Sequence, residues 1–315
     1  MYIKYISSYV PRNNRNFSYF RKKLGKNYKR IINYTGFKKI HIIKKNTSID
    51  DFIFKSLNSF IKNNNINKKE IDCLIYSSHT RLNEMPNYSI TLQKKLNLSN
   101  QILAYDLPNS CSAFTNGLIH SNALLKSGTS KNILLICADF HSTKLKDTNK
   151  NLTPVIGDGM SCILIKKDNR NSIKFDYGVD GQNNSILKIE KNILSMDGIK
   201  VFEFASSRVP LTISKVLKKY KNIKSKINYV VLHQPNKSIF ENLQKKIDFK
   251  IDKFISSYDH GNLSAASIPV NLCKNFPNKK IKKKLFLFVG FGSGLSWSSV
   301  IVNLNDTKVN KIIYL

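Results

Sequence analysis

The chain has 315 residues, a formal net charge of +32 and 41% hydrophobic residues. This apolar content is enough for a sizeable core and argues against a disordered chain, and the length predicts one large domain or two halves of roughly 150 residues. No apolar run approaches the ~20 residues of a membrane-spanning helix, and the start lacks the apolar segment of a signal peptide, so we expect a cytoplasmic protein without a membrane span.

In the first half, apolar patterns alternate between strand-like and helical spacing. The helical spacing of residues 50–65 precedes a buried strand. The segments that follow are expected to be strand, helix, strand, helix and strand in turn: Asp72–Ser77, Tyr88–Leu96, Gln101–Asp106, Ser112–Ser127 and Asn132–Ala138. Strands that alternate with helices predict a parallel sheet. A Gly-Asp-Gly turn and a further strand then lie within Val155–Lys166.

A polar stretch, Lys167–Ser172, separates this pattern from a similar one. The second half is expected to hold strands at Ile173–Val179, Tyr229–His233, Leu285–Val289 and Ser296–Leu304, and helices at Val201–Lys219, Ser238–Ile247 and Leu263–Cys273. The two halves follow one α/β plan, and we place the boundary near residue 170, giving domains 1–170 and 171–315.

The five cysteines form no CxxC pair, so neither a disulfide framework nor a metal site is indicated. Cys73, Cys137 and Cys162 lie in apolar strand-like runs and are expected in the core. Cys111 differs, because it follows a strand and opens a helix. The positive end of a helix dipole favours the reactive thiolate, so Cys111 is either a nucleophile or a buried cysteine at a helix start.

Two further residues could take part in chemistry. His233 ends a predicted strand, at the edge where α/β proteins place catalytic groups, although a lone histidine there is more often structural. Asn262 precedes a helix rich in small residues and is either an N-cap or a polar donor. The adjacent His260 is expected to be structural.

These residues fit one reaction when they are taken together. A cysteine accepts an acyl group, and a neutral histidine and asparagine donate hydrogen bonds to a carbonyl oxygen that becomes an enolate. The Gly290–Gly294 run, Gly-Phe-Gly-Ser-Gly, lets backbone amides approach an oxyanion. A papain-like hydrolase also uses Cys, His and Asn, but its local motif around the cysteine is missing here.

Several motifs, in this order and spacing, resemble those of the beta-ketoacyl-acyl carrier protein synthase III family of the thiolase superfamily. They are Tyr34-Thr-Gly-Phe, Cys111-Ser-Ala-Phe-Thr, Ile156-Gly-Asp-Gly, Met196-Asp-Gly, His233-Gln-Pro-Asn, His260-Gly-Asn-Leu-Ser-Ala-Ala-Ser-Ile-Pro and Phe291-Gly-Ser-Gly. The resemblance implies a thiolase-like, five-layered α/β/α/β/α fold with two pseudo-repeated halves and, usually, a homodimer.

The resemblance also implies roles for individual residues. Cys111 would take an acyl group from acyl-CoA or an acyl carrier protein, and the backbone amides of Cys111 and Ser293 would form the oxyanion hole. His233 and Asn262 would stabilise the enolate formed when malonyl-acyl carrier protein loses CO₂. The substrates would be coenzyme A or phosphopantetheine thioesters, and no cofactor or metal would be required. Substrate contacts are expected at Asn236, Gly198, Phe202, Met85 and Lys38.

Two features of the sequence concern the acyl donor and the carrier protein. Phe37-Lys38 stands where the family often has Ile-Arg, and Lys does not bind phosphate in a bidentate manner, so CoA and a carrier-bound acyl donor both remain candidates. Acyl carrier proteins are acidic, so a basic docking face is expected, with Lys237, Lys245 and Lys246 as its candidates. The overall positive charge otherwise indicates a solvated surface, and nucleic acid is the least favoured partner.

Three functions are therefore compared. The first is a decarboxylating ketosynthase that primes fatty-acid synthesis or a specialised acyl chain. The second is an acyltransferase of the same fold that does not condense, against which Asn262 counts. The third is a basic binding module that has lost activity, against which the intact Cys111, His233 and Asn262 count.

Overall fold

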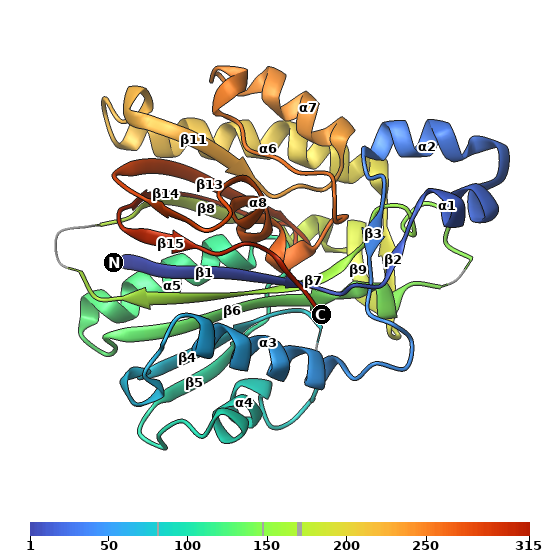
Figure 1. The fold of residues 1–315 in the computed structure, drawn as a ribbon. Coiled ribbons are helices and arrows are strands. Elements are labelled where there is room, and N and C mark those ends of the chain that lie inside the picture. Colours follow the sequence, from blue (N-terminus) through green and yellow to red (C-terminus); the bar gives the residue numbers. More distant parts are fainter. Residues whose placement is uncertain (81, 147, 169–171) are drawn as a thin grey trace.

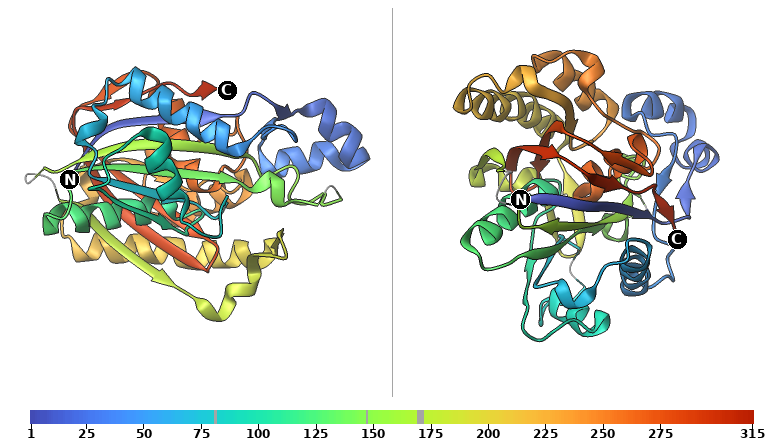
Figure 2. Two further views of the ribbon diagram at one scale, coloured as in Figure 1. Left: turned by 90° about the horizontal axis from the view of Figure 1, so that it is seen from below. Right: turned by 60° about the vertical axis from the view of Figure 1, so that its left-hand side comes forward.

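The computed structural model describes residues 1–80, 82–146, 148–168 and 172–315. Two sheets lie face to face with helices between them and outside them (Figure 1). The first sheet has the strand order β12-β15-β1-β7-β6-β4-β5, with β16 also paired to β1. The second has the order β11-β13-β14-β8. This is the thiolase-like α/β/α/β/α arrangement that the sequence predicts, and Figure 2 shows its layers from two other sides.

The first sheet combines segments from both ends of the chain. Its strands are β1 (Tyr2–Val10), β4 (Cys73–Ser77), β5 (Leu103–Leu107), β6 (Asn132–Phe140), β7 (Asp158–Lys166), β12 (Lys279–Ile281), β15 (Thr307–Val309) and β16 (Ile313–Tyr314). Strand β4 pairs in parallel with both β5 and β6, which confirms the predicted parallel unit. Strand β7 is antiparallel to β6 and β1.

The second sheet belongs to the later part of the chain. Its strands are β8 (Lys174–Val179), β11 (Ile227–Leu232), β13 (Lys284–Gly292) and β14 (Ser296–Leu304). Two short hairpins lie outside the sheets: β2 (Asn14–Arg15) with β3 (Ile40–His41), and β9 (Leu187–Glu190) with β10 (Ile193–Met196). The domain boundary expected near residue 170 falls at positions 169–171, outside the described residues, so the division into 1–170 and 171–315 stays a prediction.

The helices form three layers, and the distribution of apolar residues along each helix explains its position. Helices α5 (Ala113–Ser127) and α8 (Ser267–Asn275) lie between the sheets and are apolar on most sides. Helices α3 (Ile49–Asn63) and α4 (Tyr88–Leu96) cover the first sheet, and α6 (Gly198–Lys219) and α7 (Lys237–Lys246) cover the second. Each of these four buries one apolar stripe and exposes a charged face. Helices α1 (Phe17–Leu24) and α2 (Tyr28–Thr35) pack beside the hairpin β9–β10.

The hydrophobic core consists of several apolar clusters, each lying between two neighbouring layers. One apolar cluster lies between the two sheets and includes Phe114 and Phe288, whose rings meet edge to face with centroids 5.2 Å apart. Two others lie under the outer helices of each sheet. Cys73, Cys137 and Cys162 are fully buried, as predicted. Because both faces of α5 are packed, the residue that begins it cannot shift freely.

Candidate active site

Cys111 lies immediately before α5, between the two sheets. Ser112 is the N-cap residue of this helix, so the thiol sits beside the helix N-terminus. Burial raises the pKa of the Cys111 thiol to about 11, and the nearby Ser264 hydroxyl opposes this only in part. A helix N-terminus contributes at most ~2 kcal/mol to an anion, which is less than the cost of removing a thiolate from water. The helix N-terminus favours a thiolate, as the sequence indicates, but burial outweighs it, so the thiol of the free site is protonated.

Strand β13 passes unusually close to Cys111. A Cβ atom on Gly292 would lie 2.6 Å from Cys111 Cβ and 2.9 Å from its Sγ, and one on Gly290 would lie 2.7 Å from the Ser112 Cα. Only glycine fits at these two positions. The close approach brings the next residue, Ser293, to the wall of the cavity that contains Cys111. The backbone N–H groups of Cys111 and Ser293 donate to no other described residue.

Substituting Gly292 with Ala is expected to lower the rate of Cys111 acylation by about 100-fold, because a displacement of the order of 1 Å costs a reaction that much. The rate can be followed by intact-protein mass spectrometry. Gly181→Ala is the matched control, since a Cβ there meets nothing within 4 Å. Acylation of Gly292→Ala at the wild-type rate would show that β13 does not fix the position of the thiol.

His233 follows β11 and is almost completely buried. Burial lowers the pKa of His233 to about 3, so the imidazole is neutral at pH 7. Its ring meets Phe291 edge to face with centroids 5.4 Å apart, and Phe291 lies between the two glycines that contact the Cys111 turn. Nδ1 has no hydrogen-bond partner among the described residues. Packing against Phe291 therefore positions the imidazole ring, and its Nδ1 atom remains without a hydrogen-bond partner among the described residues.

Asn262 lies in the loop before α8 and lines the same cavity as Cys111. Its Oδ1 accepts a hydrogen bond of 2.9 Å from the Ser264 N–H, and its backbone bonds to Val155 and Gly157 on both sides. Because the amide oxygen is occupied, the Nδ2 group is the part of the side chain that can donate to a ligand. The neighbouring His260 instead bonds to the Tyr314 hydroxyl at 2.8 Å and stacks on that ring, which supports the structural role expected for it.

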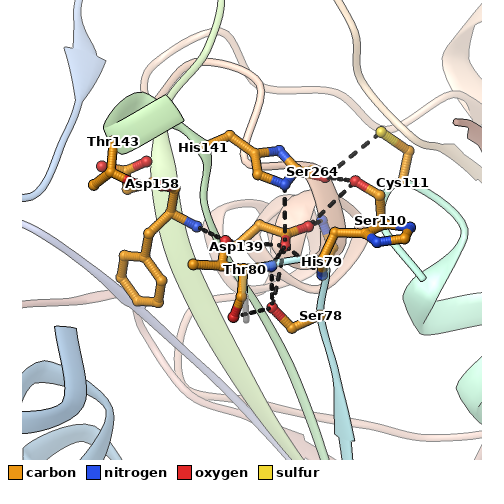
Figure 3. A network of polar contacts seen from close by, with 12 residues as sticks. Ser78, His79, Thr80, Ser110, Cys111, Asp139, His141, Thr143, Asp158 and Ser264 are labelled. Carbon is orange, nitrogen blue, oxygen red and sulfur yellow. Dashed lines mark hydrogen bonds and ion pairs between the residues drawn. The ribbon is translucent and has the colours of Figure 1, made fainter. Parts of the chain in front are cut away.

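A buried polar network extends from Cys111 into the first sheet (Figure 3). The Sγ atom of Cys111 lies 3.6 Å from the Ser264 Oγ, which lies 2.6 Å from the Ser110 Oγ. Ser110 donates to Asp139 Oδ2 at 3.4 Å. On the other side of Asp139, the His141 Nε2 lies 3.3 Å from Oδ1. A carboxylate at the end of β6 therefore fixes the hydroxyl that touches the nucleophile.

Asp139 is fully buried, and its carboxylate oxygens accept hydrogen bonds from several groups. The donors include the backbone N–H groups of His79, Thr80 and Ala265. Burial acts to raise its pKa, but His141 and the hydrogen bonds outweigh burial and hold the pKa of Asp139 well below its usual value. Burial likewise acts to lower the pKa of His141, yet the Asp139 carboxylate raises it. The two side chains form an ion pair in the core.

Asp139→Asn is expected to destabilise the fold by about 3 kcal/mol, because the charge that pairs with His141 is lost and the amide NH₂ would face the backbone N–H donors that now bond to the carboxylate. Chemical unfolding at pH 7 measures this. The depressed pKa of Asp139 also predicts that wild-type stability falls as the pH drops below about 4, and that this loss is smaller in the Asn variant. Asp252→Asn, at an exposed position, is the control; equal unfolding midpoints for the two variants would contradict the prediction.

The other residues expected to contact substrate do not line this cavity. Asn236 is the N-cap of α7, where its Oδ1 accepts from the Ile239 N–H at 2.8 Å. Gly198 begins α6, Phe202 is half-buried on that helix, and Lys38 is exposed. Met85 is 90% exposed. Asp197, whose meaning the sequence left open, caps α6 by accepting from two backbone N–H groups.

The expected docking lysines lie on α7, which starts directly after Asn236. Lys245 and Lys246 are exposed, and Lys237 is half-buried with Glu241 3.7 Å away. No cluster of metal-ligating side chains occurs within the described part of the chain. No helix among the described residues is long and apolar enough to cross a bilayer.

The fold is thiolase-like, and the named relatives of this chain are acyltransferases. Family models for 3-oxoacyl-[acyl-carrier-protein] synthase III match residues 105–181, and for the C-terminal part of that family residues 217–304. The chain belongs to the 3-oxoacyl-[acyl-carrier-protein] synthase III family.

Full-length relatives agree with this assignment. The chain is 31% identical to a beta-ketoacyl-[acyl-carrier-protein] synthase III of Acholeplasma laidlawii, over 96% of this chain and 98% of the relative. It is 30% identical to a putative 3-oxoacyl-[acyl-carrier-protein] synthase 3 of Campylobacter jejuni, over 91% and 88%. The crystal structure of a 3-oxoacyl-(acyl-carrier protein) synthase from Burkholderia xenovorans superposes with a TM-score of 0.93 at 23% identity, covering 100% of this chain and 97% of that one.

Proposed function

We propose that this chain condenses an acyl thioester with malonyl-acyl carrier protein through an acyl-Cys111 intermediate. The observation that carries the proposal is the position of Cys111 and Asn262 on one cavity, with the Asn262 amide oxygen occupied so that its N–H₂ remains to donate. The neutral His233, which packs against Phe291, supplies the second donor.

In the first step the Cys111 sulfur attacks the carbonyl carbon of the donor thioester. The new C–S bond forms as the donor C–S bond breaks, and the proton of the Cys111 thiol ends on the departing thiolate. The backbone N–H groups of Cys111 and Ser293 stabilise the oxyanion that forms between these events. One such donor contributes roughly 3–4 kcal/mol.

In the second step the malonyl group loses CO₂, and its carbanion attacks the carbonyl carbon of the acyl-Cys111 thioester. The negative charge that develops on the malonyl thioester oxygen is stabilised by His233 and Asn262. A neutral imidazole and an amide are suited to this task, since both are much weaker acids than an imidazolium, which would protonate the carbanion. The Cys111 thiolate then leaves and takes a proton from solvent.

The carrier protein is proposed to approach along α7, where Lys237, Lys245 and Lys246 provide positive charge beside Asn236. The phosphopantetheine arm would pass Asn236, Gly198 and Phe202 on its way to Cys111. Lys38 offers a single cation to a phosphate, which favours a carrier-bound donor over CoA. A homodimer, in which Met85 of one subunit closes the acyl cavity of the other, would account for the exposure of that side chain.

The test is intact-protein mass spectrometry in two steps. The protein is first incubated with a panel of acyl-CoA and acyl-carrier donors, and malonyl-acyl carrier protein is then added. A mass gain on Cys111 that is lost to a 3-oxoacyl-carrier product supports the proposal. An adduct that malonyl-carrier does not discharge would indicate acyl transfer without condensation, and no adduct from any donor would indicate a binding protein.

A further inference from the structure

The cavity beside Cys111 has a volume of about 570 Å³ and is lined by both apolar and nitrogen-bearing side chains. The apolar part includes Ile156 together with Leu187, Ile189 and Leu194 of the hairpin β9–β10. A hydrocarbon segment of an acyl group would be buried against these side chains. The nitrogen donors among the lining residues are groups that a plain alkyl chain cannot satisfy.

His141 is the innermost of these donors. It is 5% exposed, and its Nε2 faces the Asp139 carboxylate, so the imidazolium form is stabilised. Nε2 meets Asp139 as an ion-pair contact without regular hydrogen-bond geometry, and the side chain lines the cavity, where Nδ1 is bonded to none of the described residues. In Figure 3 the ring lies beside Ser264, and a dashed line joins one of its nitrogens to Asp139. A cationic N–H donor is therefore available close to the nucleophile.

Lys144 adds a second cation to the lining. It is half-buried, its Nζ contacts the Asn192 side-chain oxygen, and no carboxylate of the described residues lies within ion-pair distance of it. The other lysine of the cavity, Lys188, is already paired with Glu190 at 2.8 Å. The one carboxylate among the described lining residues, Glu84, is exposed. Lys144 is thus a cation of the cavity that no described carboxylate pairs with.

We propose that the acyl group accepted by Cys111 carries an oxygen acceptor, a hydroxyl or a carboxylate, that binds His141 and Lys144 while its carbon chain lies against the hairpin β9–β10. This inference rests on the proposed function, since it names the class of acyl donor for the same nucleophile. A donor pair with two cationic members binds an oxygen acceptor more strongly than neutral donors do. An alkyl end in this place would leave Lys144 desolvated without an anion and would offer no acceptor to His141.

The test compares three four-carbon donors that differ only near the distal end: butyryl, 3-hydroxybutyryl and succinyl thioesters, each on CoA and on acyl carrier protein. Acylation rates of Cys111 are measured by intact-protein mass spectrometry. We expect the succinyl or the 3-hydroxybutyryl donor to react at least tenfold faster than butyryl, and the faster of the two identifies the acceptor. A butyryl rate equal to or above both others would overturn the inference.

Two variants separate the cavity from the general positive charge. Lys144→Met should reduce the preference for the oxygen-bearing donor by about tenfold, corresponding to roughly 1.4 kcal/mol. Lys146→Met, an exposed neighbour that does not line the cavity, should leave the preference unchanged. An unchanged preference in Lys144→Met would contradict the assignment. If no donor acylates Cys111, the proposed function itself fails, whereas acylation by butyryl alone removes only this inference.

Discussion

Replacing Cys111 by Ser should abolish acyl-enzyme formation, with a fall in the acylation rate of roughly 10⁴-fold or more. A serine hydroxyl is a far weaker nucleophile than a thiol unless a base takes its proton. The described contacts of Cys111 offer no such base. Its neighbour is the Ser264 hydroxyl, and the network behind that hydroxyl ends at Asp139, whose depressed pKa makes it a poor proton acceptor.

The measurement is the mass gain of the intact protein after incubation with the best donor. The variant keeps Cys73, Cys137, Cys162 and Cys273, all of which are buried, so it also tests whether any other thiol reacts. An adduct formed at the wild-type rate would place the acyl group on a different residue and would remove the nucleophile from the proposed mechanism.

His233→Ala and Asn262→Asp should retain acylation but lose condensation by about 10²–10³-fold each, as expected when one donor to a developing oxyanion is removed. Asn262→Asp is the sharper of the two. A carboxylate oxygen can still accept the Ser264 N–H, so the loop keeps its geometry. The group facing the malonyl thioester changes, however, from a donor to an anion that repels the enolate.

Condensation is followed as CO₂ released from labelled malonyl-acyl carrier protein by enzyme that has first been acylated. Asn58→Asp, at an exposed position on α3, controls for the change in net charge. Normal CO₂ release by acylated Asn262→Asp would show that this residue does not stabilise the enolate. Loss of acylation in both variants would instead indicate that His233 and Asn262 are needed for the reaction of Cys111 with the donor.

Local apolar patterns were sufficient to predict most elements of the fold. Helix α4 and strand β14 have the bounds expected from the sequence, Tyr88–Leu96 and Ser296–Leu304, because each has a clear apolar period. The hairpin β9–β10 was not predicted, since its strands are short and half-polar. The pairing of β15 with β1 joins segments some 300 residues apart, which no local pattern encodes.

For the site, the order of motifs pointed to Cys111, His233 and Asn262, and two of these line one cavity. The sequence did not point to Asp139, Ser110, Ser264 or His141. Asp139 had one signal, a carboxylate near the carboxyl end of an otherwise apolar strand, where α/β proteins gather functional groups. The helix position predicted only that a thiolate is favoured there; the burial that raises the thiol's pKa cannot be judged from that position alone.

Strand β1 pairs on one edge with β7 and on the other with β15 and β16. During synthesis on the ribosome, β1 emerges long before residues 307–314 and has an unpaired edge until they follow. A nascent chain that holds an open edge for so long is exposed to mispairing with other chains. This sheet therefore reaches its native pairing only after β15 and β16 have been synthesised.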